Sequence, residues 1–377
     1  MPATSGAPAQ IRSHSGLRGI AALLVVMYHA HFGAAYLLPF EQATAIFQRS
    51  YLMVDLFFIL SGFIISHVNR ADRRHGYARG EVGDFLARRL IRIYPLLLFT
   101  LATLVLFRLA AAALAIHSAE TGWDRRSLVL LAAQFLMLNA WLPNNDGWNT
   151  ASWSISAEMA AYLLFPLVVS LRARARMAAR LLIILGALAF YGIVAAGSAS
   201  LDIIAGTAPL RCLAGFALGM LIYDARYRFA ALPAALLAAM QIAAAAAILS
   251  LLAIPSNDVL IVAPFALLVA SSWTDRGLAG PLLGNRLMLW LGDRSYSVYL
   301  NHLIVKAMLL VPWGFVARRT APDPMLERAG FLLVYLASVL LVSHLTYRLI
   351  EIPARRWLTR RWLHHPATPI AASAPAP

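Results

Sequence analysis

The sequence predicts an all-α fold: a polytopic transmembrane helical bundle with about ten spanning helices plus one re-entrant or interfacial segment. Apolar side chains make up 61% of the 377 residues and charged ones only 13%, and the mean hydropathy is +0.70, well outside the average of soluble domains. The apolar side chains also fall into runs near the length that a bilayer requires. Ten such runs are found, at 17–38, 51–68, 90–109, 153–171, 181–198, 203–223, 231–253, 259–273, 288–312 and 329–350.

Arginine placement predicts the orientation of these helices, because short cytoplasmic loops are enriched in Lys and Arg. The stretch 69–92 carries seven arginines against three acids, and 172–180 carries four arginines and no acid. Both are expected in the cytoplasm, so the chain crosses an even number of times between them. The runs 90–109 and 153–171 satisfy that requirement. The shorter run 127–142 is therefore predicted to be re-entrant or interfacial on the far side, and the full count places both termini in the cytoplasm.

Composition excludes several function classes. The net charge of +15 does not indicate a nucleic-acid partner, since the arginines lie between hydrophobic segments and form no continuous basic face. The single cysteine, Cys212, excludes an intrachain disulfide and a cysteine-rich metal site, and no metal is expected. The first apolar run is typical of a retained helix and not of a cleaved signal peptide. We expect one membrane-embedded domain over 1–365 and a disordered Pro/Ala-rich tail over 366–377.

The first apolar run contains an arginine and a histidine, Arg18 and His29. Eleven positions separate them, so they differ by about 20° around a helix and by roughly 16 Å along it. Ionisable groups in hydrocarbon cost several kcal/mol unless they face protein or water, which makes them candidates for a functional site. A neutral imidazole at this depth suits a general base acting on a hydroxyl. The alternative is structural: Arg18 serves as a cytoplasmic anchor and His29 as an interhelical hydrogen-bond donor.

Two further segments carry candidate binding residues. Ser61 and Gly62 lie in the centre of the second run, where small side chains permit the close approach of a narrow ligand or, equally, of another helix. The third run opens with Arg88, Arg89 and Arg92, whose spacing clusters guanidinium groups on a helix. Such a cluster suits a phosphate ligand, whereas the alternative is the ordinary cytoplasmic arginine signal with lipid headgroup contact.

Polar residues also mark three later helices. A descending helix opens with Trp153, Ser154 and Glu158; the tryptophan is typical of an interfacial anchor, whereas the glutamate must face protein or a cavity. On the helix 288–312, positions 295, 299 and 302 share a face, so Ser295, Tyr299 and His302 are expected to line one cavity. The last helix ends at Glu351.

In their order along the chain, these segments resemble acyltransferase family 3, membrane proteins that O-acylate carbohydrates and other hydroxylated acceptors. The resemblance rests on six stretches: GLRGIAALLVVMYH, VDLFFILSGFIIS, FLARRLIRIYP, SWSISAEMAAYLLFP, RSYSVYLNHLIV and YRLIEIPARRW. They cover nearly the whole chain. One departure is visible, because many members have Asp-Gly-Leu-Arg where this chain has Ser15-Gly16-Leu17-Arg18. Serine still serves as a helix N-cap, but a role that needs the charge of that aspartate is in doubt here.

The resemblance implies a ten-helix fold that takes an acyl group from cytoplasmic acyl-CoA, by default acetyl-CoA, and delivers it to an acceptor at the opposite face. It implies that Arg18 and His29 are the essential pair, and that the family's arginine and SG motifs fall on Arg88, Arg89 and Arg92 and on Ser61 and Gly62. His29 then acts either as general base or as a transient acyl carrier. A bacterial inner membrane is the location that the resemblance implies.

Two other function classes remain open from the sequence. A secondary transporter of a sugar or related solute could use the same buried ionisable groups, although no clear internal repeat is visible. A non-enzymatic membrane scaffold would not need Arg18 and His29 on one face. The acceptor stays open among polysaccharides, other envelope glycans, lipid-linked sugars and secondary metabolites, and the sequence carries no signal for oligomeric state.

Overall fold

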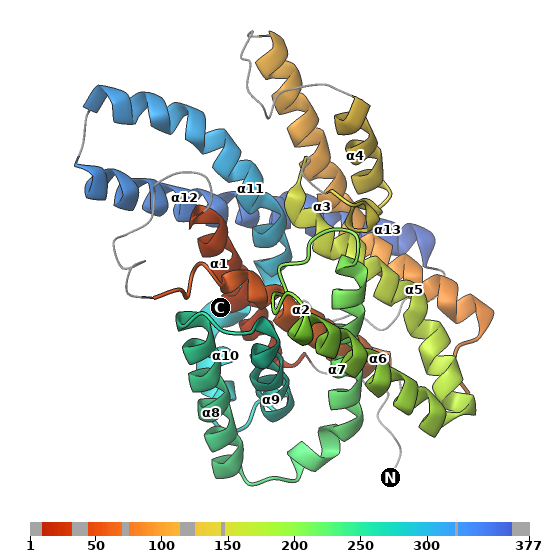
Figure 1. Ribbon diagram of the computed structural model, residues 1–377. Helices are drawn as coiled ribbons and strands as arrows, with labels where there is room; N and C mark the ends of the chain where they lie inside the picture. The colour runs from red at the N-terminus through yellow and green to blue at the C-terminus, as the bar shows by residue number, and fades with distance from the viewer. Residues whose placement is uncertain are drawn as a thin grey trace, which may run out of the picture.

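The computed structural model describes residues 10–31, 44–69, 75–113, 125–144, 148–320 and 323–363, and over these residues it contains helices and loops but no strand (Figure 1). The α-helices, with the labels of Figure 1, are α1 Arg12–His31, α2 Met53–Val68, α3 Arg79–Ala113, α4 Arg125–Phe135, α5 Trp153–Arg174, α6 Arg176–Ala196, α7 Ala208–Ala230, α8 Ala234–Ala253, α9 Val262–Ser272, α10 Ala279–Leu283, α11 Arg286–Thr320, α12 Pro324–Thr346 and α13 Ile352–Trp362. The structure therefore confirms a helical bundle. The predicted tail 366–377 lies outside the described residues.

Seven helical segments in the described part of the chain are long and apolar enough to cross a membrane: Ser50–Val68, Gly80–Ala113, Thr150–Arg174, Arg176–Ala196, Ala208–Ala230, Ala234–Ala253 and Met325–Trp362. Of the other predicted spans, α1 and α11 are long helices that carry charged residues, and α9 has only 11 residues. The count of ten therefore stays a prediction.

The segment 127–142 forms α4, a short helix that ends at Phe135, followed by a turn and one 3-10 turn, Asn139–Trp141. Met137, in the turn between them, has a φ of 55°, a left-handed conformation that a helix cannot contain. An 11-residue helix spans about 16 Å, roughly half the thickness of the hydrocarbon core. The segment is too short to cross as a helix.

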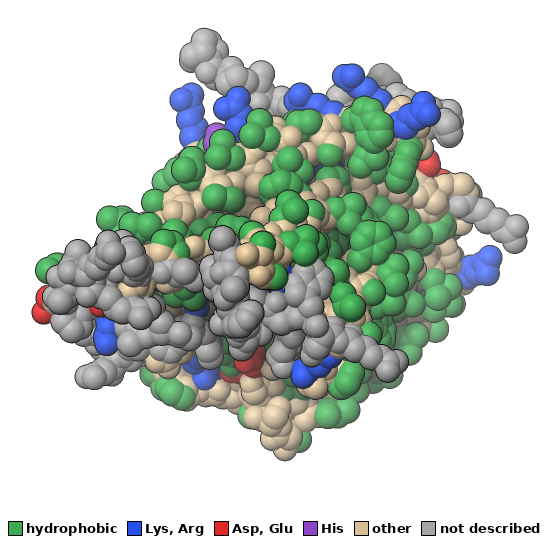
Figure 2. Space-filling model, turned by 90° about the horizontal axis from the view of Figure 1, so that it is seen from above, with side chains coloured by type: hydrophobic (Ala, Val, Ile, Leu, Met, Phe, Trp, Pro, Cys, Tyr) green, Lys and Arg blue, Asp and Glu red, His purple; other side chains and the backbone are tan. Residues whose placement is uncertain are grey.

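Large apolar side chains cover much of the outside. Along α6, Leu182 is 65% exposed and Ile193 is 74% exposed, with Leu185 and Leu188 similarly bare. Figure 2 shows the same pattern over one face, where apolar side chains dominate and Lys and Arg concentrate along the upper edge of the view. Soluble proteins rarely expose apolar surface on this scale, so these faces require lipid.

Helices α2 and α7 cross at very short range. A Cβ atom added at Gly62 would lie 2.0 Å from the Phe216 carbonyl oxygen, and one added at Gly219 would lie 2.1 Å from the Ile59 carbonyl oxygen. Neither position has room for a larger residue. The two glycines let the backbones approach as in other membrane helix pairs.

The same two helices are joined by a buried ion pair. Arg211 donates from Nε and Nη2 to the two carboxylate oxygens of Asp55, at 3.1 and 2.7 Å, and from Nη1 to the Ile203 carbonyl oxygen at 3.3 Å. The side chains of Arg211 and Asp55 are both fully buried. Such a bidentate pair is strong, and removing one partner would leave an uncompensated charge inside the bundle.

The end of α12 widens into a π-helical turn, Tyr347–Glu351, before α13 begins. Pro353 lies within the first turn of α13. In a regular α-helix its ring would clash with the carbonyl group of Leu349, four residues earlier. π-Helical turns are rare, and those that do occur are often found at functional sites. This one leaves Glu351 buried, where it accepts a hydrogen bond from Ser297 Oγ on α11 at 3.0 Å.

Candidate active site

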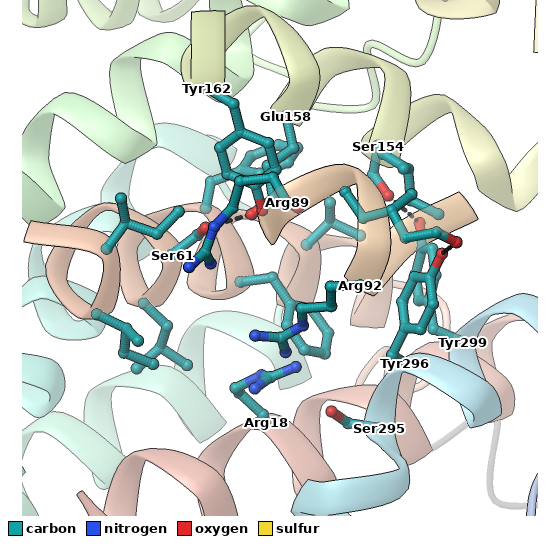
Figure 3. Close-up of a pocket in the computed structure, with 18 residues that line it drawn as sticks. Arg18, Ser61, Arg89, Arg92, Ser154, Glu158, Tyr162, Ser295, Tyr296 and Tyr299 are labelled. Carbon is teal, nitrogen blue, oxygen red and sulfur yellow. Dashed lines mark hydrogen bonds between the residues drawn. The ribbon is translucent and has the colours of Figure 1, made fainter. Parts of the chain in front are cut away.

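Five helices, α1, α2, α3, α5 and α11, enclose a cavity of about 110 Å³ (Figure 3). Eighteen residues line it, and its apolar wall includes Val54, Phe57 and Ile155. Its polar lining consists of Arg18, Ser61, Arg89, Arg92, Ser154, Glu158, Tyr162, Ser295, Tyr296 and Tyr299. Eight candidate residues from these five helices therefore meet here: Arg18, Ser61, Arg89, Arg92, Ser154, Glu158, Ser295 and Tyr299.

Three of the lining residues are arginines. Arg18 comes from α1, whereas Arg89 and Arg92 lie one helical turn apart on the inner face of α3, and Figure 3 shows all three directed into the cavity. Within the described residues, none of the three guanidinium groups forms a hydrogen bond or an ion pair, and Arg89 Nε is buried without a partner. Arg89 does lie over the rings of Phe85 and Tyr162, at 5.6 and 6.0 Å. The cavity therefore presents guanidinium N–H donors that no acceptor in the described residues satisfies.

Arg88 belongs to the same predicted cluster, but it does not line the cavity. At about 100° per residue, Arg92 projects from α3 between the directions of Arg88 and Arg89, so Arg88 lies at the edge of the inward face. The structure thus places two arginines of the predicted cluster in the cavity lining and leaves the third at its margin.

One carboxylate lines the cavity. Glu158 on α5 accepts a hydrogen bond from Ser61 Oγ on α2, shown as a dashed line in Figure 3, and lies within electrostatic range of Arg18 and Arg89. Glu351 approaches the same arginines from outside the lining, within electrostatic range of Arg18 and Arg92. These carboxylates reduce the repulsion among the three cations, but the lining itself keeps three positive groups against one negative group.

The other end of the cavity is lined by hydroxyl groups. Ser154 Oγ donates to the Tyr299 hydroxyl at 2.9 Å, and the Tyr296 hydroxyl donates to the Ile93 carbonyl oxygen at 2.7 Å. Ser295 and Tyr299 both face the cavity, but His302, predicted to share it, does not. His302 is fully buried beyond Tyr299, with the two ring centres 5.8 Å apart.

His302 instead meets His29 on α1. Its Nε2 lies 3.2 Å from His29 Nδ1, and the ring centres are 4.7 Å apart. His29 Nδ1 also lies 3.0 Å from the Val25 carbonyl oxygen, and the ammonium group of Lys306 donates to the His29 carbonyl oxygen. His29 therefore lies outside the cavity lining, separated from it by His302 and Tyr299.

On its other side His29 contacts Tyr28, whose ring meets the imidazole edge-on at 4.8 Å and the ring of Tyr51 at 5.4 Å. The hydroxyl of Tyr51 donates to Asp258 at 2.6 Å. Nearby, in the loop before α7, burial raises the pKa of the Asp202 carboxyl while Arg211 opposes that rise. Aromatic and acidic groups thus form the surroundings of His29 away from the cavity.

Two remaining candidates pack within the protein. Gly62 lies against α7 and does not line the cavity, in agreement with the packing alternative. Trp153 is 6% exposed, packs edge-on against Phe58 and lies under the guanidinium of Arg211 at 5.2 Å. The interpretation of Trp153 as an interfacial anchor is therefore wrong, because the ring fills the space between α5, α2 and α7.

Two residues of the cavity, Tyr162 and Tyr296, were not predicted from the sequence. Tyr162 lies one turn after Glu158 and so shares its face of α5, which is a signal that helical periodicity contains. Tyr296 directly follows Ser295, and no pattern distinguished it from an ordinary membrane tyrosine. Among the described residues there is no group of His, Cys, Asp and Glu side chains suited to a metal ion.

The sequence also matches known proteins. A family model described as an acyltransferase domain matches residues 12–348. The chain is 35% identical over 167 residues to the acyltransferase MdmB of Streptomyces mycarofaciens. The aligned stretch covers 42% of this chain and 39% of that protein. The chain is 27% identical over 172 residues to the O-acetyltransferase OatA of Staphylococcus aureus, covering 43% of this chain and 25% of OatA.

A third relative, protein 2 in the picA locus of Rhizobium radiobacter, is 38% identical over 94 residues, or 24% of this chain and 42% of that protein. The chain thus spans less than half the length of each of these relatives. No solved structure matches it.

Proposed function

The chain belongs to the family of acyltransferase domains, and from this premise we propose that it carries an acyl group, acetyl by default, from cytoplasmic acyl-CoA to a hydroxyl group across the membrane. The acceptor is a saccharide or another hydroxylated molecule at the opposite face. The location that fits this reaction is a bacterial inner membrane with both termini in the cytoplasm.

The observation that carries the proposal is the set of three arginines without hydrogen-bond or ion-pair partners among the described residues, which line one cavity between five helices. Guanidinium groups match phosphate oxygens with paired N–H donors, and the CoA diphosphate would supply the counter-anion that Arg18, Arg89 and Arg92 lack. An uncharged solute would leave the three cations unpaired. A phosphorylated donor is therefore the ligand that the charges of this cavity favour.

The position of His29 fits a long donor molecule. Arg18 and His29 share α1, and eleven residues of helix separate them by roughly 16 Å. A diphosphate held at Arg18 and Arg92 would leave the pantetheine arm to extend past Val54, Phe57 and Tyr299 toward the histidine pair. Apolar side chains and hydroxyl groups suit an arm that consists of methylene and amide groups. Small side-chain movements at Tyr299 would complete the path.

His29 then performs the transfer by one of two routes. In the direct route its imidazole takes the proton from the acceptor hydroxyl as that oxygen attacks the thioester carbon, and the proton passes to the CoA thiolate that leaves. In the two-step route the imidazole nitrogen attacks the thioester carbon and CoA thiolate leaves. The acceptor oxygen later displaces the acyl group from the histidine, and the proton of the acceptor hydroxyl passes by way of the freed imidazole to the thiolate. Both routes use the same residue.

The test is acetyl-CoA turnover by the purified protein in nanodiscs, with a panel of candidate glycans. We expect thiol release by the wild type, loss of release in His29→Ala, and a raised KM for acetyl-CoA in Arg18→Gln and Arg92→Gln. Arg176→Gln, which removes an exposed arginine at the start of α6, is the matched control.

Failure of well-folded wild-type protein to bind or consume any acyl-CoA would contradict the proposal. Solute flux without acyl-CoA binding would then favour the transporter alternative.

A further inference from the structure

We propose that His302 is a positioning residue that holds the reactive tautomer of His29 and stabilises the charge that His29 acquires during transfer. The proposal rests on the proposed function, since it assumes that His29 accepts a proton or an acyl group. It is carried by hydrogen-bond contacts of the two imidazoles, both of which lie outside the donor cavity.

The contacts of His302 determine which of its ring nitrogens carries the hydrogen. Its Nδ1 lies 2.6 Å from the Tyr299 carbonyl oxygen, and a carbonyl oxygen can only accept a hydrogen bond. Nδ1 must therefore carry the hydrogen. In the neutral ring the other nitrogen, Nε2, then has a free lone pair, and this is the atom that lies 3.2 Å from His29 Nδ1.

The contacts of His29 determine its tautomer in turn. Its Nδ1 faces two acceptors, the Val25 carbonyl oxygen at 3.0 Å and the lone pair of His302 Nε2. Nδ1 therefore carries the hydrogen of the neutral His29 ring and shares it between the two. The lone pair of His29 is left on Nε2, which has no hydrogen-bond partner within the described residues. This nitrogen is the atom that the reaction needs.

His302 also affects the positive charge that the His29 ring acquires during transfer. When His29 Nε2 takes a proton or an acyl group, the ring becomes positively charged and its Nδ1–H becomes a stronger donor. Lys306, 8% exposed and bonded to the backbone of His29, opposes that charge. The lone pair of His302 faces the charged ring and offsets this repulsion, so no proton needs to leave His302. The arrangement parallels a histidine oriented by a carboxylate, with a neutral acceptor in place of the anion.

The test compares His302→Leu with His302→Gln in the acetyl-CoA turnover assay. Removal of the partner that orients a functional histidine typically costs about 10- to 100-fold in activity, and we expect a fall of that size in kcat for His302→Leu with KM for acetyl-CoA within about twofold. His302→Gln retains an oxygen acceptor and should recover most of the lost kcat. A residue that only fills space would not be rescued by an acceptor atom.

His14→Gln is the matched control, because His14 is also fully buried, also contacts a backbone carbonyl, Val269 O at 3.0 Å, and lies at the opposite end of α1. Its kcat should match the wild type. Equal kcat in His302→Leu and wild type would overturn the proposal, as would equal losses in the Leu and Gln variants with matching falls in thermal stability. A wild type without turnover would instead overturn the proposed function, so the two failures are distinguishable.

Discussion

The molecule holds inward-facing arginines in two different ways. Arg211 is fully buried and satisfied, with both oxygens of Asp55, a backbone carbonyl and the face of Trp153 around its guanidinium. Arg18, Arg89 and Arg92 are held by the same bundle around an enclosed cavity, yet none has a hydrogen-bond or ion-pair partner in the described part of the chain. The fold supplies the partners of Arg211, so breaking that set would leave an unpaired charge in the bundle, whereas the half-buried guanidinium groups of the cavity keep N–H donors for a ligand. The difference assigns separate roles to residues of the same type.

The largest expected effect is on the satisfied arginine. Asp55→Ala would leave Arg211 charged and unpaired in the bundle, at a cost of about 3–5 kcal/mol of stability. We expect a sharp fall in the melting temperature in nanodiscs, or loss of folded protein, with or without acetyl-CoA. Arg18→Gln is the comparison, since it removes a cation that the fold does not satisfy and should not lower the melting temperature. Equal destabilisation by both changes would break the distinction.

A smaller and different effect is expected at the cavity. Arg92→Gln should weaken acetyl-CoA binding by about 10- to 100-fold, corresponding to the roughly 1.5–3 kcal/mol of one hydrogen bond to a charged group. Stability without ligand should stay at the wild-type value or rise, because mutual repulsion with Arg18 is relieved. Titration of acetyl-CoA by calorimetry measures the first quantity and thermal unfolding the second. Unchanged affinity would exclude Arg92 from the donor site.

The smallest effect sharpens the geometry within α3. Arg88 has the same charge as Arg92 but does not line the cavity. Arg88→Gln should change the acetyl-CoA affinity by less than about fivefold, the size of a solvent-screened charge effect of 0–1 kcal/mol. The same calorimetric titration tests this. A loss equal to that of Arg92→Gln would mean that net charge at this membrane surface, and not the inward direction of the side chain, determines binding.

Helical periodicity in the sequence predicts which residues share a face of one helix. It was most informative where a prediction involved residues of a single helix. Arg18 was singled out by its helical spacing from His29, and Arg88, Arg89 and Arg92 by their spacing on one helix, although Arg88 does not line the cavity; each predicted run corresponds to a helix. The ends were less accurate. Hydropathy began the third helix at 90, whereas α3 begins at Arg79, because about three polar helical turns outside the hydrocarbon leave no apolar signal.

Partners between helices could not be predicted from one sequence. Arg211 and Asp55 are 156 positions apart, and His29 and His302 are 273 apart. The helical face of each residue was readable, but which other helix covers that face depends on how the whole bundle packs. Gly62 shows the same limit, since its neighbour Ser61 faces the cavity while Gly62 itself meets the backbone of α7.

The most direct test of the central claim is the shift in melting temperature that acetyl-CoA causes in the wild type, Arg18→Gln and Arg92→Gln, measured side by side in nanodiscs. Because a ligand stabilises the folded state by mass action, we expect a rise of several degrees in the wild type at saturating acetyl-CoA and a clearly smaller rise in the two variants at the same concentration. An equal rise in all three proteins would contradict the account, since the donor would then bind without the unpartnered arginines.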